Sequence, residues 1–259
     1  MSKHILLGIS GGIAAYKSCE LVRLLKKQGH SISVVMSKTS TEFISPLTFQ
    51  ALSGNPVLTD MHENGLGNGM AHINLTREAD ALVIAPATAN TIAKISNGIA
   101  DNLLTNLVAA RKCPLAVAPA MNVEMWNNPA NLRNIEQLRS DGITVFQPAY
   151  GEQACGEIGL GRMLEAADLA DLISDLWVPK ILLGKRILIT AGATFEAIDP
   201  VRGITNISSG QMGMALARAC RAAGAKVTLI YGQLQTTIPT GLLHTEQAVS
   251  AEEMFHSVH

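Results

Sequence analysis

Short apolar runs alternate along this chain with stretches in which apolar residues recur at helical spacing. The apolar runs lie at residues 4–10, 31–37, 80–87, 114–120 and 143–149. Between the first two runs, Leu21, Leu24 and Leu25 follow helical spacing until Gly29, a residue type that commonly ends helices. Runs without polar alternation are typical of strands buried on both faces. The order therefore predicts an α/β fold, a doubly wound parallel sheet covered by helices on both faces.

The same plan restarts near Gly184. Residues 177–185 read as a connector, and residues 185–194 then give a new strand and a turn. A glycine-containing turn opens a predicted helix at residues 208–224, and a strand follows at 225–231. We expect a first domain over residues 1–183 and an incomplete Rossmann-like α/β domain over 184–259.

Composition excludes several classes of protein. The chain is 47% hydrophobic and 16% charged, which argues against disorder. A formal net charge of −1 with 4% aromatic residues provides neither the basic surface nor the stacking platform of a nucleic-acid binder. No uninterrupted apolar run approaches the ~20 residues that cross a bilayer, so no membrane partner is expected.

The four cysteines, Cys19, Cys113, Cys155 and Cys220, form no CxxC pair. Their spacing predicts neither a disulfide framework nor a metal site, and it favours a reducing cytoplasm. Lys3 followed by ILLGISGGIAA imitates a signal peptide, but a helical pattern follows where a cleavage site should be.

The turn after the first strand reads GISGG, in which Gly8, Ser10 and Gly12 fit the GxSxG pattern of a nucleophile elbow. A hydrolase elbow normally follows several earlier strands, whereas this one follows the first. A second interpretation is a phosphate-binding turn, in which small residues let backbone amides approach an anion. A plain tight turn is the third, and GxGxxG is absent.

Polar side chains also follow the later strands. Ser37 and Thr39, and then Thr88 and Thr91, offer hydroxyls that suit a bound nucleotide, although Ser and Thr also cap helices. Asn122 follows another strand, where its amide can hold a carboxylate or cap the next helix. Ligands of parallel sheets bind beyond the carboxyl ends of the strands, so these groups should converge on one crevice.

Cys155 lies in the stretch QACGEIGLGRM, among Gly151, Gly156, Gly159 and Gly161. A buried cysteine would be an ordinary small hydrophobic residue, but this glycine content describes a mobile loop. Such a loop can close over a pocket and deliver a proton donor when substrate is present. Arg162 can engage an acidic substrate group or form a surface ion pair, and His72 is either a catalyst or a structural hydrogen-bonding residue.

Together these segments carry a family resemblance. GISGGIAAYK, AHINLTREAD, PATANTIAKISNGIADNLL, APAMNVEMW and ACGEIGLGRM resemble the flavin-dependent cysteine decarboxylases, over residues 1–183. The resemblance is strongest to the bifunctional bacterial proteins of coenzyme A biosynthesis, which join phosphopantothenoylcysteine decarboxylase to phosphopantothenate–cysteine ligase. It implies that FMN is bound by Ser10, Gly11, Gly12, Ile13, Ser37, Thr88, Asn90 and Thr91.

The resemblance also implies roles in catalysis. It assigns His72 as the base, Asn122 as the group that holds the substrate carboxylate, and Cys155 as the proton donor. The substrate-clamping loop then contains Gly156, Gly159, Gly161, Arg162 and Met163. The implied reaction is FMN-dependent decarboxylation of 4'-phosphopantothenoylcysteine to 4'-phosphopantetheine, in which oxidation of the cysteine side chain creates an electron sink.

ITAGATFEAIDPVRGITNISSGQMG resembles the start of the ligase domain, and Asn206 matches a residue of its motif. That domain uses CTP and Mg²⁺. Gln211 stands where the family motif has lysine, Gly203 replaces an aromatic residue and Ala193 replaces glycine. The segments that supply most CTP contacts in the family are also missing, so we expect a shortened chain that decarboxylates and does not ligate.

Two other functions stay open at this point. Flavin prenyltransferases share the GISG and MSK segments, and a flavin-binding regulatory subunit could keep the fold without catalysis. The combined PAMN and ACGEIGLGRM motifs speak against the prenyltransferases, and retention of His72, Asn122 and Cys155 together speaks against the regulatory subunit. The resemblance further implies a homotrimer, with a dodecamer as the larger assembly of the bifunctional proteins.

Overall fold

The computed structural model of the protein describes residues 2–59 and 71–259, without the side chains of residues 71–74. Two compact units make up the chain, Met1–Ala170 and Asp171–His259. The predicted division between residues 183 and 184 stays a prediction.

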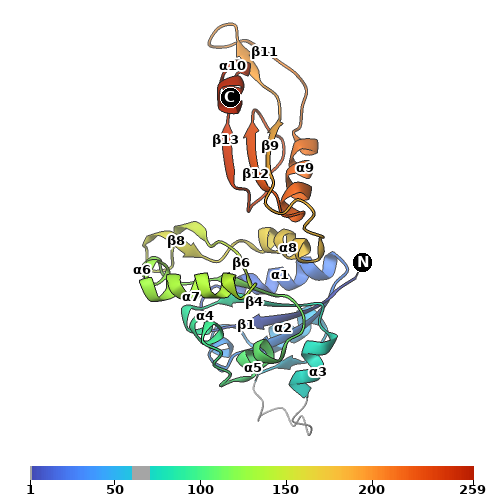
Figure 1. Ribbon diagram of the computed structural model, residues 1–259, viewed down its shortest axis with the longest axis vertical. Helices are drawn as coiled ribbons and strands as arrows, with labels where there is room; N and C mark the ends of the chain where they lie inside the picture. The colour runs from blue at the N-terminus through green and yellow to red at the C-terminus, as the bar shows by residue number, and fades with distance from the viewer. Residues whose placement is uncertain (1, 60–70) are drawn as a thin grey trace. The chain divides into compact units, whose positions relative to one another are not determined.

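The first unit contains a parallel sheet of six strands (Figure 1). Its strands are β1 (His4–Ile9), β2 (Ser31–Met36), β3 (Val57–Leu58), β4 (Ala81–Ala87), β5 (Leu115–Pro119) and β6 (Thr144–Val145). Their order is β3-β2-β1-β4-β5-β6, and every neighbouring pair is parallel. The order reverses between β1 and β4, which is where ligands of doubly wound sheets bind. The predicted fold class is confirmed.

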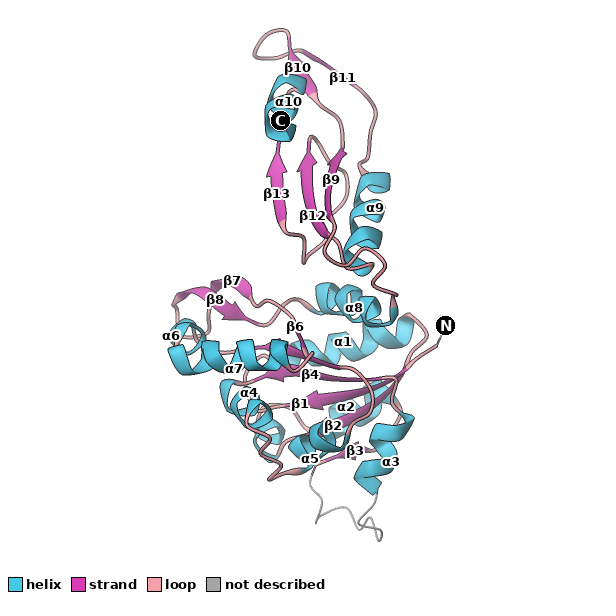
Figure 2. Ribbon diagram, in the orientation of Figure 1, coloured by secondary structure: helices cyan, strands magenta, loops and turns pink. Residues whose placement is uncertain are grey.

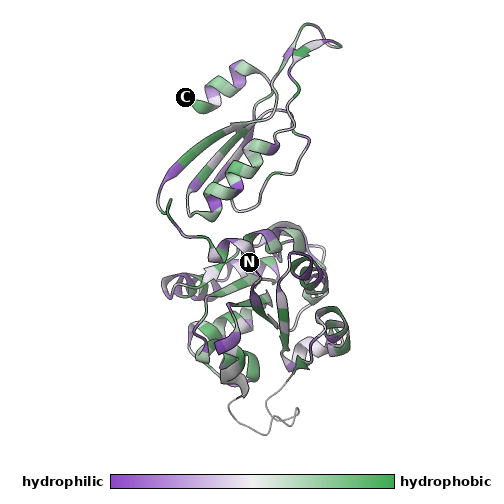
Figure 3. Cartoon of the chain, turned by 90° about the vertical axis from the view of Figure 1, so that its right-hand side faces the viewer, coloured by the Kyte–Doolittle hydropathy of each residue, from purple (hydrophilic) through white to green (hydrophobic). Residues whose placement is uncertain are grey.

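Helices cover both faces of this sheet (Figure 2). The helices up to residue 177 are α1 (Ala15–Lys27), α2 (Pro46–Ser53), α3 (Ala71–Glu78), α4 (Ala89–Ser96), α5 (Leu103–Ala110), α6 (Val123–Asn127), α7 (Pro129–Ser140) and α8 (Ala166–Ser174), with the 3₁₀ helix η1 (Lys38–Glu42), and the 3₁₀ helix η2 (Asp175–Trp177) follows α8. Each of the α-helices carries both hydrophobic and hydrophilic residues (Figure 3), as expected for helices that pack on one side and are solvated on the other. The last turns of α8 and all of η2 belong to the second unit.

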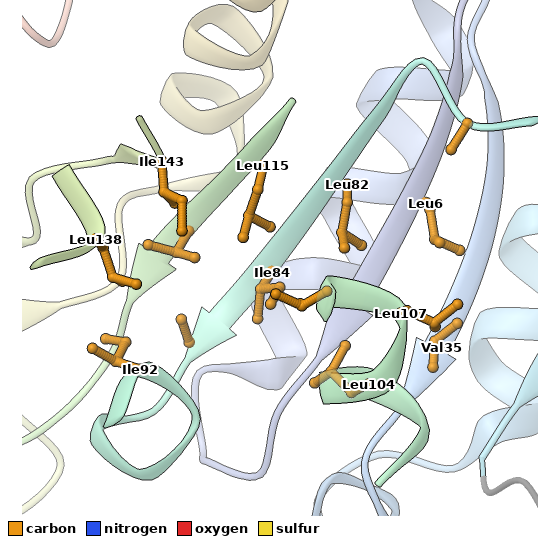
Figure 4. Packing of buried hydrophobic residues seen from close by; sticks show 14 of the residues in the cluster. Leu6, Val35, Leu82, Ile84, Ile92, Leu104, Leu107, Leu115, Leu138 and Ile143 are labelled. Atoms are coloured by element: carbon orange, nitrogen blue, oxygen red, sulfur yellow. The ribbon is translucent and has the colours of Figure 1, made fainter. Parts of the chain in front are cut away.

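One layer of the core lies between the sheet and helices α4, α5 and α7 (Figure 4). Leu6, Leu82 and Ile84 project from β1 and β4 onto Leu104 and Leu107 of α5, and none of the five is more than 2% exposed. Alternate residues of β1 point to the opposite face, where α1 packs against β2 and β4. This double burial fixes the ends of β1 and β4 and so fixes the loops that follow them.

The structure corrects one expectation about residues 143–149. Only Thr144 and Val145 pair with β5, and the ladder ends where the backbone N–H of Phe146 donates to the Val117 carbonyl. Pro148 has no N–H to continue it. The chain then forms an antiparallel hairpin of β7 (Ala149–Glu152) and β8 (Ile158–Arg162), outside the six-stranded sheet (Figure 2).

The second unit has its own parallel sheet, ordered β13-β12-β9. Its elements are β9 (Arg186–Ala191), β10 (Phe195–Ala197), β11 (Gly203–Thr205), α9 (Gln211–Ala222), β12 (Lys226–Tyr231), β13 (His244–Gln247) and α10 (Ala251–Val258). Met214 and Ala217 of α9 form a separate core with Leu229. A capping box of Ser250 and Glu253 opens α10. None of the helices in the described residues is both long and apolar enough to span a bilayer.

Candidate active site

A pocket of about 960 Å³ lies beyond the carboxyl ends of the strands in the first unit. Its walls are the turn after β1 (residues 11–13), the loop after β2 (37–39), the segment after β4 (88–91), the segment after β5 (120–122) and the β7–β8 hairpin (152–155 and 161–163). The predicted convergence of the strand ends on one crevice is confirmed for these segments. The pocket also lies beside the point where the strand order reverses.

Ser10, predicted to bind FMN, is buried beside this pocket and is not one of its lining residues. Its side chain is 1% exposed, and its hydroxyl donates to the Pro86 carbonyl (2.7 Å) while accepting the Thr88 N–H (3.0 Å). A nucleophile elbow exposes its serine, so burial of this hydroxyl overturns the hydrolase alternative. Ser10 instead links the turn after β1 to the segment after β4.

Gly11 allows the turn after β1 to approach the loop after β2. A Cβ atom at this position would lie 2.6 Å from Cγ2 and 2.7 Å from Cβ of Thr39, closer than side chains pack. At Gly12, the nearest atom to such a Cβ is Cγ2 of Thr88, at 3.7 Å. The small residues of GISGG therefore bring three strand ends together around the pocket.

The predicted hydroxyls line the pocket and also cap helices. The Ser37 hydroxyl accepts the Ser40 N–H at the start of η1, and Thr88 accepts the Thr91 N–H at the start of α4. The hydroxyls of Thr88 and Thr91 lie 3.1 Å apart. The capping alternative is confirmed for Ser37 and Thr88, and a role of these hydroxyls toward a bound nucleotide stays a prediction.

Asn122 and Cys155 meet at the mouth of the pocket. Asn122 caps α6, where its Oδ1 accepts the Glu124 N–H at 2.8 Å, so its Nδ2 points toward the hairpin. Nδ2 lies 3.4 Å from the Cys155 sulfur and 3.3 Å from Oε1 of Gln153, and it also donates to the Glu157 carboxylate. Cys155 is exposed in the turn of the hairpin. The two residues thus come together from segments that are 33 positions apart in sequence.

A buried cation anchors the base of the hairpin. Lys17 of α1, whose side chain is 8% exposed, donates to the Met163 carbonyl (2.9 Å) and to the Glu165 carboxylate (2.6 Å). Arg162 lies 3.6 Å from the same carboxylate, so the surface ion pair expected as its alternative is present. The helix that starts at the turn after β1 therefore also holds the hairpin.

The pocket rim carries a further ion pair that sequence reasoning missed. Lys94 of α4 contacts Asp101 at 2.7 Å, and its hydrogen bond holds the pKa of that carboxyl below the ordinary value. Lys17, Gln153 and Glu157 were missed as well. Gln153 and Glu157 flank the cysteine in QACGEIGLGRM, which is the signal that could have found them.

Other predicted residues are placed differently. The backbone of His72 lies in α3, but its side chain is outside the described part of the structure. Gly159 packs on Val123 within β8, and Gly156 stands in the hairpin turn with a φ of +85°. Asn206 belongs to the second unit, where it is exposed after β11.

The pocket suits FMN on the chemistry of its lining. Gly11 and Gly12 leave no side chain between the backbone and a ligand, and the hydroxyls of Ser37, Thr88 and Thr91 can donate to a phosphate or a ribityl chain. The exposed side chain of Ile13 and that of Met125 add an apolar surface for a ring system. These groups sit at the place where doubly wound sheets bind nucleotides.

The fold and this pocket define a flavoprotein, and the chain belongs to the Flavoprotein family, whose model matches residues 1–177. Residues 182–259 match the model of the DNA/pantothenate metabolism flavoprotein C-terminal domain. Among curated relatives, the coenzyme A biosynthesis bifunctional protein CoaBC of Vibrio parahaemolyticus is 51% identical over 256 residues, 99% of this chain and 64% of that protein. CoaBC of Bacillus subtilis is 43% identical over 260 residues. The chain thus spans less than two thirds of the length of these relatives.

Solved structures agree with this assignment. A PPC decarboxylase mutant complexed with pantothenoylaminoethenethiol is 35% identical with a TM-score of 0.61, covering 68% of this chain and 99% of that one. The FMN-binding protein AtHal3 is 36% identical with a TM-score of 0.59, over 68% of this chain and 96% of its own. The peptidyl-cysteine decarboxylase EpiD is 27% identical with a TM-score of 0.58, over 67% of this chain and 99% of its own.

Proposed function

We propose that this protein binds FMN in the pocket of its first unit and decarboxylates 4'-phosphopantothenoylcysteine to 4'-phosphopantetheine. The observation that carries the proposal is the pairing of Asn122 with Cys155 at the pocket mouth, with Nδ2 and Sγ 3.4 Å apart. A carboxylate on the amide would place the neighbouring carbons of a cysteine-derived substrate within reach of the thiol. Hydroxyls and backbone at the strand ends support the cofactor.

Asn122 orients the substrate in this mechanism. Oδ1 of Asn122 is held by the Glu124 N–H, so the amide presents only its N–H groups to the pocket. These groups are hydrogen-bond donors and therefore bind an acceptor such as a carboxylate. The substrate bond between the carboxylate and its neighbouring carbon, which breaks when CO₂ leaves, is then held in one orientation. Loss of CO₂ from an unmodified cysteine would leave an unstabilised carbanion, and bound FMN would supply the oxidation that creates an electron sink.

Cys155 holds a proton at Sγ for the carbon from which CO₂ has left. The thiol lies in the turn of the β7–β8 hairpin, whose base is tied to Lys17, so the hairpin can cover the pocket and exclude water while the proton moves. We assign His72 as the base that takes a proton from the substrate. This assignment follows the family resemblance, and the His72 side chain lies outside the described residues.

The test follows the visible spectrum of the FMN-loaded protein anaerobically after addition of 4'-phosphopantothenoylcysteine, in wild type and Cys155→Ser. We expect wild type to form 4'-phosphopantetheine. The variant should release a product that has lost CO₂ but lacks two hydrogen atoms, with the flavin left reduced. A protein that cannot bind FMN, or a variant that turns over normally, would contradict the proposal; Cys19→Ser is the matched control because Cys19 is outside the pocket.

We propose no CTP- and Mg²⁺-dependent ligase reaction for residues 184–259, on account of Gln211 and Gly203 at two positions of the ligase motif. Formation of phosphopantothenoylcysteine from phosphopantothenate, cysteine and CTP by this chain would refute that part. Ligase activity in a longer form of the protein would not test the proposal for this chain.

We also propose a homotrimer, working in the cytoplasm. Ile13, Tyr16 and Leu47 are 56% to 69% exposed around the turn after β1 and on α2, an apolar surface that an assembly would cover. All four cysteines are free, as a reducing compartment requires. Light scattering after size exclusion distinguishes a trimer from a dodecamer and from a monomer.

A further inference from the structure

The amide of Asn122 has no hydrogen left for a substrate. Nδ2 carries two hydrogens, and three acceptors of its own chain surround it: Oε1 of Gln153 at 3.3 Å, the sulfur of Cys155 at 3.4 Å and the carboxylate of Glu157. The amide cannot turn over to offer more, because Oδ1 is held by the Glu124 N–H. An incoming carboxylate must therefore displace one of these partners.

Gln153 is the partner that stays. Its Oε1 also accepts the Val123 N–H at 3.0 Å, and its Nε2 donates to the Leu160 carbonyl at 3.3 Å. These bonds tie both strands of the hairpin to the start of α6, so moving Gln153 would break several contacts at once.

Glu157 is the partner that leaves. Its side chain is exposed, and within the described residues its contacts are the Asn122 amide and, at 3.7 Å, the Cys155 sulfur. Moving the Glu157 carboxylate from the Asn122 amide into water therefore requires little free energy. Two carboxylates on one amide would also repel each other, so a bound substrate carboxylate itself drives Glu157 away.

We propose that the Glu157 carboxylate is an internal competitor: it occupies the place of the substrate carboxylate on Asn122 until substrate displaces it. The inference rests on the proposed function and adds a positioning residue to it. Glu157 acts through Asn122, since it sets how strongly that amide binds a carboxylate. After CO₂ has left, the same side chain can return to the amide, so decarboxylation does not leave Asn122 without an acceptor.

Two inert ligands test this on the FMN-loaded protein by calorimetry. One is 4'-phosphopantothenoylserine, which keeps the carboxylate but has no thiol to oxidise, and the other is 4'-phosphopantothenoylethanolamine, which lacks the carboxylate. A neutral amide binds Asn122 more weakly than a carboxylate does, so Glu157→Gln should tighten binding of the serine ligand about five- to tenfold. The ethanolamine ligand should bind as it does to wild type.

Glu152→Gln is the matched control. Glu152 is exposed on the same hairpin and lines the pocket, so this variant removes the same charge without touching Asn122. We expect it to tighten the serine ligand less than Glu157→Gln does, because Glu152 makes no hydrogen bond to Asn122 and exposed charges are screened. Glu157→Ala should shift the serine ligand in the same direction as Glu157→Gln, and thermal unfolding checks that all three variants are folded.

The outcomes separate the two claims. If wild type binds both ligands and Glu157→Gln weakens the serine ligand, or shifts both ligands equally, Glu157 is a brace and not a competitor. If Glu152→Gln matches the effect of Glu157→Gln, net charge explains the result and the inference fails. Should wild type bind neither ligand, the proposed function falls, and the inference that rests on it falls too.

Discussion

At the scale of single residues, a few buried polar groups hold the segments around the pocket of the first unit in place. Ser10 joins the segments after β1 and β4, and Lys17 joins α1 to the chain that follows β8. Neither residue is more than 8% exposed. A buried polar group that loses its partner costs more than an ordinary bond contributes, so these positions tolerate change poorly.

Lys17→Met tests this anchoring. The variant leaves the buried Met163 carbonyl without its donor, and we expect the free energy of unfolding of the first unit to fall by about 1–3 kcal/mol. Chemical denaturation followed by circular dichroism measures it. Lys27→Met, at an exposed position of the same helix, is the control, and equal loss in both variants would show that Lys17 anchors nothing.

Asp80 makes stability depend on pH. The His4 N–H and then the Lys3 ammonium hold the pKa of this carboxyl below 3.8 in the folded state. A lowered folded pKa gives stability that is present above the unfolded value and lost as pH falls through the folded value. Asp80→Asn should therefore lower the free energy of unfolding by no more than about 1 kcal/mol near pH 6, because the Lys3 and Asp80 side chains are partly exposed. At strongly acid pH the substitution should have no effect on it.

Urea denaturation of wild type and Asp80→Asn between pH 3 and 6 measures that difference, with the exposed Glu42→Gln as control. A difference that grows as the pH falls would contradict the assigned cause.

At the scale of secondary structure elements, the β7–β8 hairpin depends on one glycine for its contact with the segment after β5. The Met121 N–H donates to the Gly161 carbonyl at 2.9 Å, and Gly161 has a φ of +142°. A Cβ atom there would lie 2.3 Å from the Met121 carbonyl oxygen, which is backbone and cannot turn aside. The close approach brings the hairpin to Asn122.

Gly161→Ala should therefore separate the hairpin from Asn122 and reduce kcat/KM for decarboxylation at least about 100-fold. Gly156→Ala is the matched comparison, because nothing lies within 4 Å of its Cβ and only its φ of +85° is strained. We expect that variant to lose about 1 kcal/mol of stability and little activity. Equal activity of the two variants would show that the Met121 contact does not position the hairpin.

The sequence predicted four of the six strands well. β1, β4 and β5 are buried along nearly their whole length and read as continuous apolar runs, whereas β2 begins SIS and is continuously buried only over its last three residues. β3 has two residues, too short to give a pattern, and β6 takes up only Thr144 and Val145 of the strand predicted over residues 143–149. Residues at strand ends were predicted to converge because parallel topology forces it. Lys17, Gln153 and Glu157 were missed because their role depends on contacts between segments far apart in sequence, which periodicity does not encode.

At the scale of the whole molecule, the two units have separate cores. The core of the first unit joins the sheet to α4, α5 and α7, and that of the second joins β9 and β12 to α9. Arg221, whose side chain is 6% exposed, fixes Asp175 of η2 (2.8 Å) and Asp171 of α8 (3.1 Å) within the second unit. Separate cores can unfold separately.

We expect calorimetry of this chain to show two unfolding transitions. In the proposed function FMN binds only the first unit. At an FMN concentration of 100 times the Kd, the free energy of unfolding of that unit should rise by about 2.7 kcal/mol. The midpoint temperature of one transition should therefore rise, and that of the other should stay unchanged. A single transition, or a shift of both midpoints, would contradict two independently folding units. Riboflavin, which lacks the phosphate, serves as the weaker-binding control.

The hairpin that carries Cys155 is an attachment to the sheet and not one of its strands. Lys17, the Met121 amide and the Gln153 side chain provide three of its links to the rest of the first unit, and each of these three bonds has a backbone group on one side. The sequence of the hairpin can therefore change in evolution while the pocket residues at the strand ends stay the same. Chimeras that keep these links and take the hairpin from a related protein are the rational way to change which cysteine-containing substrate this protein accepts.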